Sequence, residues 1–146
     1  MNNKIIIING PNLNLLGERE QSQYGTITFK KLKENCINKS KELGLDLEFI
    51  QSNIEGELVE TIQKARDKFD GLIINPAAYT HSSIAILDSL RAIKKPKIEI
   101  HLSNIYAREE YRKKSITSEG VDGLICGFGS NSYILGIEAI DKLIYN

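Results

Sequence analysis

Five short apolar runs recur along the chain, and segments with helical spacing of apolar residues separate them. The first run, Lys4–Asn9, is almost wholly β-branched, which is typical of a strand buried on both faces of a sheet. The other runs are Leu45–Ser52, Gly71–Asn75, Lys97–Leu102 and Gly123–Gly127. Strands that alternate with helices in this way form a parallel sheet covered on both faces, with right-handed crossovers.

The segments between these runs predict the covering helices. After Thr28, a candidate N-cap, apolar residues recur at steps of three and four until Gly44. Further helices are expected over Glu57–Phe69, after a cap at Ser82 or Ser83, and over Tyr133–Tyr145. We therefore expect a flavodoxin-like α/β three-layer sandwich whose five-stranded parallel sheet has the order 2-1-3-4-5. No linker or internal repeat interrupts residues 1–146, which indicates a single domain.

Charge and cysteine content restrict the partners. Lys plus Arg (19) equals Asp plus Glu (19), and binders of nucleic acid usually carry a basic surplus, so we expect no nucleic-acid partner. Cys36 and Cys126 lie in apolar surroundings without a C-x-x-C pattern, which favours buried thiols in a reducing compartment. Met1–Lys4 has no leader character, and the apolar run Ile5–Ile8 is too short to span a membrane. We expect a soluble, cytoplasmic protein with no membrane partner.

Both histidines of the chain, His81 and His101, fall at the carboxyl ends of predicted strands. Ligands of such sheets bind outside these ends, at the point where the strand order reverses. A lone histidine is most often structural, but two of two at the expected edge favour a functional role. Glu99 precedes His101 by two residues, so both side chains point to one face and the carboxylate can support a general acid. The alternative is an ion pair that only holds the strand.

Two arginine patterns are weaker signals. The loop after the first strand carries Arg19 and Tyr24; a phenol titrates near 10, and a neighbouring guanidinium favours the phenolate, so the pair suits a base and its activator. Two unrelated surface residues are the plainer interpretation. Arg108 and Arg112 stand four apart on a short helix predicted around Arg108–Lys113, and arginines that share a face can hold a carboxylate. The alternative is a solvated face, paired with Glu109 or Glu110.

Several common kinds of site have no pattern in this sequence. No glycine-rich phosphate loop follows the first strand, no G-x-S-x-G elbow is present, and no His, Asp and Glu set suggests a metal. No lysine ends a predicted strand, so an imine mechanism lacks a nucleophile. The remaining Tyr, His, Arg, Asn and Ser suit abstraction of a proton beside a carbonyl group, with the oxyanion held by neutral donors. We expect neither cofactor nor metal.

Blocks of sequence in a fixed order resemble type II 3-dehydroquinate dehydratase, over about Ile5 to Ala139. They are Asn9–Gly17, Gln51–Asn53, Asn75–His81, Glu99–Asn104, Ala107–Glu109 and Gly127–Gly129. The resemblance implies a lyase of the shikimate and quinate routes that converts 3-dehydroquinate to 3-dehydroshikimate. In the shikimate pathway this reaction serves aromatic amino acid biosynthesis. It also implies anti elimination through an enolate, without imine or metal.

The resemblance implies a role for each matching residue. Tyr24 is similar to the base that removes the C2 proton, and Arg19 to the residue that activates it. His101 is similar to the acid that protonates the leaving C1 hydroxyl, with Glu99 orienting it. Asn12 is similar to the group that holds a water against the enolate oxygen. The substrate-binding set that the resemblance implies is Asn75, His81, Leu102 through its backbone, Ser103, Arg108 and Arg112.

The resemblance also implies an assembly, a homododecamer built of trimers, in which Asp88 enters a neighbouring subunit's site. Leu87 stands where many members have Arg, and Tyr106 where many have His. The first puts a trimer contact in doubt, and the second the packing of the Arg108 segment. Two other functions stay open: a binding module that captures a nucleotide or small anion without chemistry, and a structural subunit with a vestigial site. The missing phosphate loop counts against the first, and the complete set of polar residues against the second.

Overall fold

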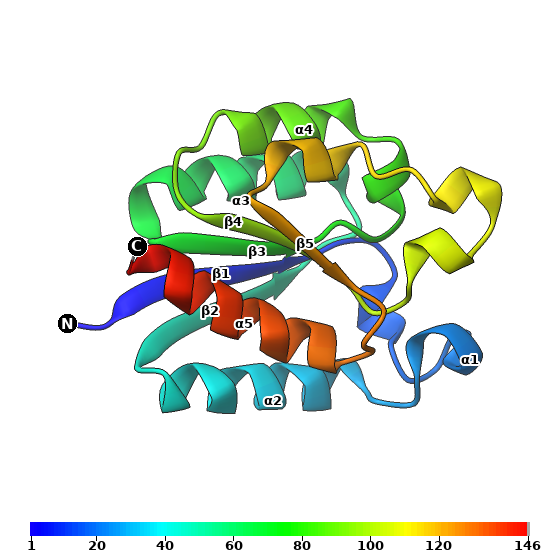
Figure 1. The fold of residues 1–146 in the computed structure, drawn as a ribbon, viewed down its shortest axis with the longest axis horizontal. Helices are drawn as coiled ribbons and strands as arrows, with labels where there is room; N and C mark the ends of the chain where they lie inside the picture. Colours follow the sequence, from blue (N-terminus) through cyan, green and yellow to red (C-terminus); the bar gives the residue numbers. More distant parts are fainter. Residues whose placement is uncertain (146) are drawn as a thin grey trace.

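The computed structural model describes residues 1–145 and consists of a parallel sheet between two layers of helices (Figure 1). The sheet order is β2-β1-β3-β4-β5, and all neighbouring strands pair in parallel. The strands are β1 (Asn3–Asn9), β2 (Leu45–Gln51), β3 (Gly71–Asn75), β4 (Lys97–His101) and β5 (Gly123–Cys126). The predicted fold class and strand order are confirmed.

Two helices cover each face of the sheet. Helices α2 (Phe29–Glu42) and α5 (Asn131–Ile144) pack on one face, and α3 (Glu55–Lys68) and α4 (Ile84–Arg91) pack on the other (Figure 1). Alternate residues of β1 enter the two cores: Ile5 and Ile7 lie with α2 and α5, whereas Ile6 and Ile8 lie with α3 and α4. A central strand that must fill both cores is apolar at every position, which explains its continuous run.

Two N-cap side chains and one glycine mark helix boundaries where the sequence predicts them. The Thr28 hydroxyl accepts a hydrogen bond from Lys31 N at the start of α2, and Ser83 does the same for Ile86 N at the start of α4. Gly44, with φ 70°, follows α2. Each cap satisfies a backbone N–H that has no partner inside its helix. No helix within residues 1–145 has the length and apolar character needed to cross a membrane.

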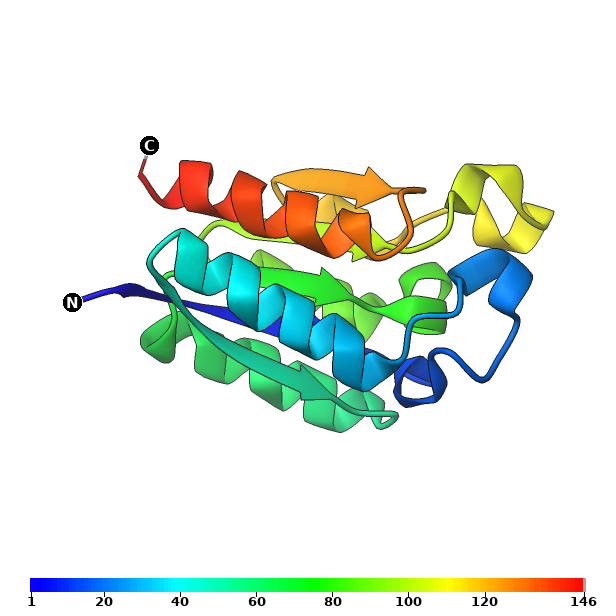
Figure 2. The same cartoon turned by 90° about the horizontal axis from the view of Figure 1, so that it is seen from below.

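The carboxyl ends of the strands meet at the end of the molecule opposite the two termini (Figures 1 and 2). There the short helix α1 (Gln21–Tyr24) lies beside the segment that follows β4 (Figure 2). The short helix predicted around Arg108–Lys113 is present only as a 3-10 turn, Glu110–Arg112, which leaves Arg108 outside it. Its backbone bonds run from Arg112 N to Glu109 O and from Lys113 N to Glu110 O, which is the spacing of a 3-10 turn rather than of an α-helix.

Candidate active site

The loops after β1 and β3 are joined at their backbones. Gly10 N donates to Asn75 O at 2.8 Å, and a Cβ on Gly10 would lie 2.5 Å from the Pro76 carbonyl oxygen. Asn12 and Ala77 have positive φ angles of 68° and 53°. Such conformations cost about 1–3 kcal/mol each and gather at functional sites, where the surrounding structure enforces them. Both residues line the same cavity.

This cavity, of about 110 Å³, opens above the ends of β1, β3 and β4. Its position is the one expected for a ligand site in a doubly wound sheet. The predicted site residues that line it are Asn12, Arg19, Tyr24, Asn75, His81, His101, Leu102, Ser103, Arg108 and Arg112. The fold therefore brings both histidines, the tyrosine and three arginines to one place.

His101 is held from behind by Glu99. Its Nε2 lies 2.8 Å from Glu99 Oε2, and the glutamate is fully buried. Beside a carboxylate Nε2 donates, which leaves Nδ1 as the other ring nitrogen. Ser115 Oγ donates to the same oxygen at 2.8 Å, and Thr117 Oγ1 donates to Glu99 Oε1. Three donors stabilise the ionised carboxylate, so this pair can carry an imidazolium. Glu99 itself does not line the cavity.

His81 makes a different hydrogen bond. Its Nδ1 lies 2.7 Å from the carbonyl oxygen of Lys114, so Nδ1 carries the proton and donates it. Burial lowers the pKa of His81, the Lys114 bond opposes this, and the charges of His101 and Arg112 lower it further. A neutral ring with Nδ1–H has an accepting Nε2, which is suited to a hydroxyl donor.

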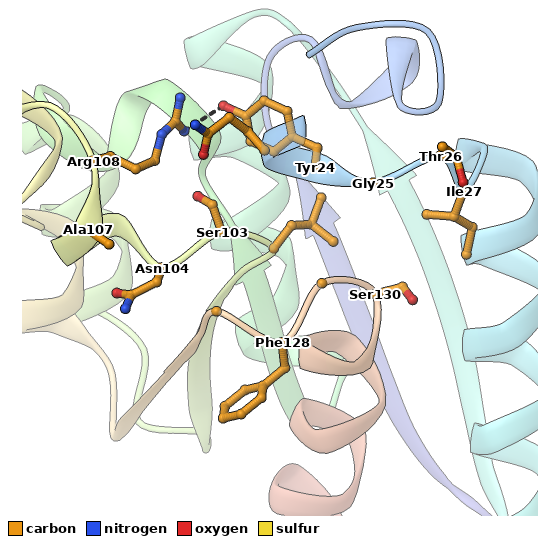
Figure 3. A pocket seen from close by; sticks show the side chains of 14 residues that line it. Tyr24, Gly25, Thr26, Ile27, Ser103, Asn104, Ala107, Arg108, Phe128 and Ser130 are labelled. Atoms are coloured by element: carbon orange, nitrogen blue, oxygen red, sulfur yellow. Dashed lines mark hydrogen bonds between the residues drawn. The ribbon is translucent and has the colours of Figure 1, made fainter. Parts of the chain in front are cut away.

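Tyr24 has two arginine neighbours. Arg108 Nη1 donates to the Tyr24 hydroxyl at 2.7 Å, and the two groups point toward one another in Figure 3. Arg19 lies over the ring, its guanidinium carbon 4.7 Å from the centroid. The prediction that Arg19 and Tyr24 lie together is confirmed, but the direct donor is Arg108. Loop contacts between segments 84 residues apart leave no local signal, so sequence reasoning missed this bond.

The arginines make the cavity positive within a chain that is neutral overall. Arg112 Nε lies 2.7 Å from a carboxylate oxygen of Glu109, in the pairing that the alternative interpretation of this segment anticipated. The Arg108 side chain is only 7% exposed, and its Nε is buried without a hydrogen-bond partner in the described residues. Buried guanidinium groups favour an anionic guest. The arrangement can therefore bind a small carboxylate and exchange protons with it.

A buried chain of hydrogen bonds fixes Asn75. The hydroxyl of Tyr133 accepts from Asn75 Nδ2 at 2.9 Å and donates to Asn9 Oδ1 at 2.6 Å. Asn75 Oδ1 accepts from Ala77 N, so the orientation of the amide is determined. Desolvation raises the pKa of the fully buried Tyr133, which keeps it a phenol. Tyr133 lies within an apolar helix stripe, and sequence reasoning did not single it out.

One predicted site residue lies elsewhere. Asp88 is exposed on α4 and does not line the cavity of this chain. Its neighbour Leu87 is 5% exposed and packs against the turn at Gly120. Tyr106 is 53% exposed. The two departures from the family pattern therefore differ: one is a core residue and the other a surface residue.

A second, wider hollow of about 570 Å³ lies outside the Tyr24–Arg108 pair (Figure 3). It shares Tyr24, Leu102, Ser103 and Arg108 with the inner cavity, but it contains neither histidine. Its remaining wall includes the exposed ring of Phe128. The acid–base residues gather in the inner cavity, which is thus the better candidate for chemistry. No group of three His, Cys, Asp or Glu side chains suited to a metal occurs within residues 1–145.

Comparisons with known proteins show which family the chain belongs to. The family model described as "Dehydroquinase class II" matches residues 3–141. The chain is 48% identical to "3-dehydroquinate dehydratase 1" of Agrobacterium fabrum, over 98% of this chain and 99% of that one. It is 51% identical to the 3-dehydroquinate dehydratase of Caldicellulosiruptor saccharolyticus, over 97% and 98%. The crystal structure of the type II dehydroquinase from Propionibacterium acnes superposes with a TM-score of 0.94 at 42% identity, covering 97% and 98%. The chain therefore belongs to the class II dehydroquinase family.

Proposed function

We propose that this chain dehydrates 3-dehydroquinate to 3-dehydroshikimate in the shikimate pathway, by anti elimination through an enolate. The observation that carries the proposal is that one cavity holds a tyrosine bonded to a guanidinium and a histidine backed by a buried carboxylate. The first pair suits a base, and the second an acid. Family membership supplies the substrate class.

In the first step the Tyr24 phenolate takes a proton from C2 of the substrate. The electrons of the broken C–H bond form a C2–C3 double bond, and the C3 carbonyl becomes an enolate. Arg108, which donates to the phenol oxygen, and Arg19, over its ring, favour the phenolate that this step requires. Asn12 holds a water against the enolate oxygen, which stabilises the developing charge.

In the second step the enolate re-forms the ketone and expels the C1 hydroxyl. The imidazolium of His101 protonates this leaving group, so that it departs as water. Because Nε2 bonds to Glu99, the proton comes from Nδ1. Glu99 stays ionised and compensates the charge of the ring before transfer. The product contains a ketone conjugated to the new double bond.

The remaining polar residues bind the substrate. Ser103 and the backbone of Leu102 hold its carboxylate, and the arginines make the cavity favourable for an anion. Neutral His81 accepts a hydroxyl proton at Nε2, since its Nδ1 bonds to Lys114. Asn75, fixed by Tyr133, and Arg112 complete the set.

We also propose the family's assembly, a homododecamer in which the twelve subunits are arranged as trimers. Asp88 is exposed on α4, where it is available to a neighbouring subunit's cavity. A cytoplasmic location is the matching proposal, because the thiols of Cys36 and Cys126 are unpaired, and disulfides are rare in a reducing compartment. Sedimentation of the wild type and of Asp88→Lys tests the assembly. A wild type that sediments as a monomer would contradict it.

The test of activity is the appearance of enone absorbance when 3-dehydroquinate is added to the purified protein. We expect turnover that a chelator does not reduce and that borohydride, added with substrate, does not abolish. Inactivation by borohydride would point to an imine intermediate and contradict the mechanism. Absence of enone at any enzyme concentration would contradict the activity itself.

A further inference from the structure

The segment Lys114–Thr117 is hydrogen-bonded both to the turn Ala77–His81, which follows β3, and to β4, which ends at His101. The Lys114 carbonyl accepts from His81 Nδ1, and Ile116 N donates to Thr80 O at 2.9 Å. In the same segment, the hydroxyls of Ser115 and Thr117 donate hydrogen bonds to the Glu99 carboxylate. Within the described residues, these are the only hydrogen bonds that side chains of this segment make to the sheet. Both go to the carboxylate that supports His101.

The two oxygens of Glu99 have different partners. Oε1 accepts from Thr117 alone within residues 1–145, whereas Oε2 accepts from both Ser115 and His101. Glu99 and Thr117 are both fully buried, so water does not replace a lost hydroxyl without a rearrangement. A carboxylate fixed at both oxygens presents one of them to the imidazole in a single orientation.

We propose that Ser115 and Thr117 are positioning residues that hold the Glu99 carboxylate ionised and aimed at His101, and so keep the acid competent. The inference rests on the proposed function for the role of His101. Neither hydroxyl touches the cavity, so neither contacts substrate. Their effect passes through Glu99 to the ring and belongs to the proton-transfer step rather than to binding.

A purely structural role makes different predictions. The hydroxyl of Thr117 also ties the 3-10 turn Thr117–Gly120 to β4, so its loss could simply loosen that turn. Loosening would disturb the neighbouring turn Ala77–His81 and with it substrate binding by His81, which raises KM. Loss of positioning lowers kcat and leaves KM nearly unchanged, because binding is the same in both states.

The substitution that separates these roles is Thr117→Val, which keeps the shape and removes the hydroxyl. Thr80→Val is the matched control, since Thr80 is also fully buried and its hydroxyl has no partner within the described residues. We expect Thr117→Val to lower kcat about tenfold, the effect of one hydrogen bond to a charged group, with KM changed by less than about twofold. Thr117→Ser restores the hydroxyl and should recover most of the loss.

A double substitution tests the route through Glu99. In a Glu99→Gln background we expect Thr117→Val to cause no further fall in kcat, because the carboxylate that it supports is gone. An equal fall in both backgrounds, a rise in KM that accounts for the loss, or the same loss in Thr80→Val would overturn the proposal. Melting curves of the folded variants accompany these measurements.

A readout without turnover separates this proposal from the proposed function. In proton NMR the Nε2–H of His101 and the Nδ1–H of His81 give two slowly exchanging ring signals, which are assigned with His81→Gln because the chain has only two histidines. In Ser115→Ala/Thr117→Val we expect the His101 signal to shift and broaden while the His81 signal stays. An unchanged His101 signal refutes the positioning role even if the enzyme is active. A wild type that forms no enone refutes the activity and leaves this result standing.

Discussion

The Tyr24 hydroxyl accepts a 2.7 Å hydrogen bond from Arg108 Nη1, whereas Arg19 lies over the face of the ring. Both guanidinium groups lie over the ring, with the Arg108 carbon 5.2 Å from the centroid, but only Arg108 also donates to the oxygen. A charge-assisted bond to the oxygen stabilises the phenolate directly, and a cation over the ring adds to it at longer range. The base thus depends on residues from two loops that meet only in the folded chain.

Removal of the phenol oxygen tests the base. We predict that Tyr24→Phe lowers kcat by about 10²–10⁴-fold, the usual contribution of a general base, while the fold is retained. Tyr24 is only half-buried and ends the single-turn helix α1, so the melting temperature of Tyr24→Phe should match that of the wild type. Retention of near-full turnover in the enone assay would remove Tyr24 from the mechanism.

The protonation of His81 makes stability depend on pH. Its pKa is lowered mainly by burial, so at mildly acid pH the unfolded chain binds a proton that the folded chain does not. We predict that the wild-type melting temperature falls as pH drops through the ordinary titration range of histidine toward the lowered value. His81→Gln should show a shallower fall over the same range by scanning fluorimetry. Identical curves for the two proteins would contradict the neutral state assigned to His81.

The buried hydrogen-bond chain through Tyr133 has a stability cost when it is broken. Tyr133→Phe leaves Asn9 Oδ1 and Asn75 Nδ2 without their partner, which costs about 1–3 kcal/mol of unfolding free energy. We also predict a higher KM, because the Asn75 amide loses its fixed orientation. Tyr145→Phe, at a 70% exposed position, is the control and should change neither quantity. If Tyr133→Phe left the free energy of unfolding in urea unchanged, water or repacking would have to satisfy both amides.

The close approach at Gly10 predicts a steric effect. In Gly10→Ala the new Cβ would meet the Pro76 carbonyl oxygen at 2.5 Å, so the two loops must separate. We predict a loss of about 1–3 kcal/mol of stability and weaker substrate binding, since the loops carry Asn12 and Asn75. Gly56→Ala, in α3 with open space around the new Cβ, should instead be neutral or gain up to about 1 kcal/mol. Equal denaturation midpoints for the two variants would contradict this account.

Sequence patterns predicted the fold well because apolar periodicity and caps act locally. The strand runs, Thr28, Ser83 and Gly44 all have the predicted roles. The cavity location followed from the sheet rule, and the family resemblance as a whole named ten of its lining residues. The prediction is least accurate after β4, where only the 3-10 turn Glu110–Arg112 forms and Arg108 lies outside it. Arg108, Tyr133 and Thr117 gained their contacts only through long-range folding, which no local pattern encodes.

The stereochemistry of proton loss tests the proposed anti elimination by Tyr24 and His101 most directly. The substrate is 3-dehydroquinate that carries deuterium at one of its two C2 positions, and mass spectrometry of 3-dehydroshikimate measures what remains. Deuterium anti to the C1 hydroxyl should be lost completely, and deuterium on the same side should be retained. Loss of the same-side label would mean that base and acid act from one face, which contradicts the proposed mechanism.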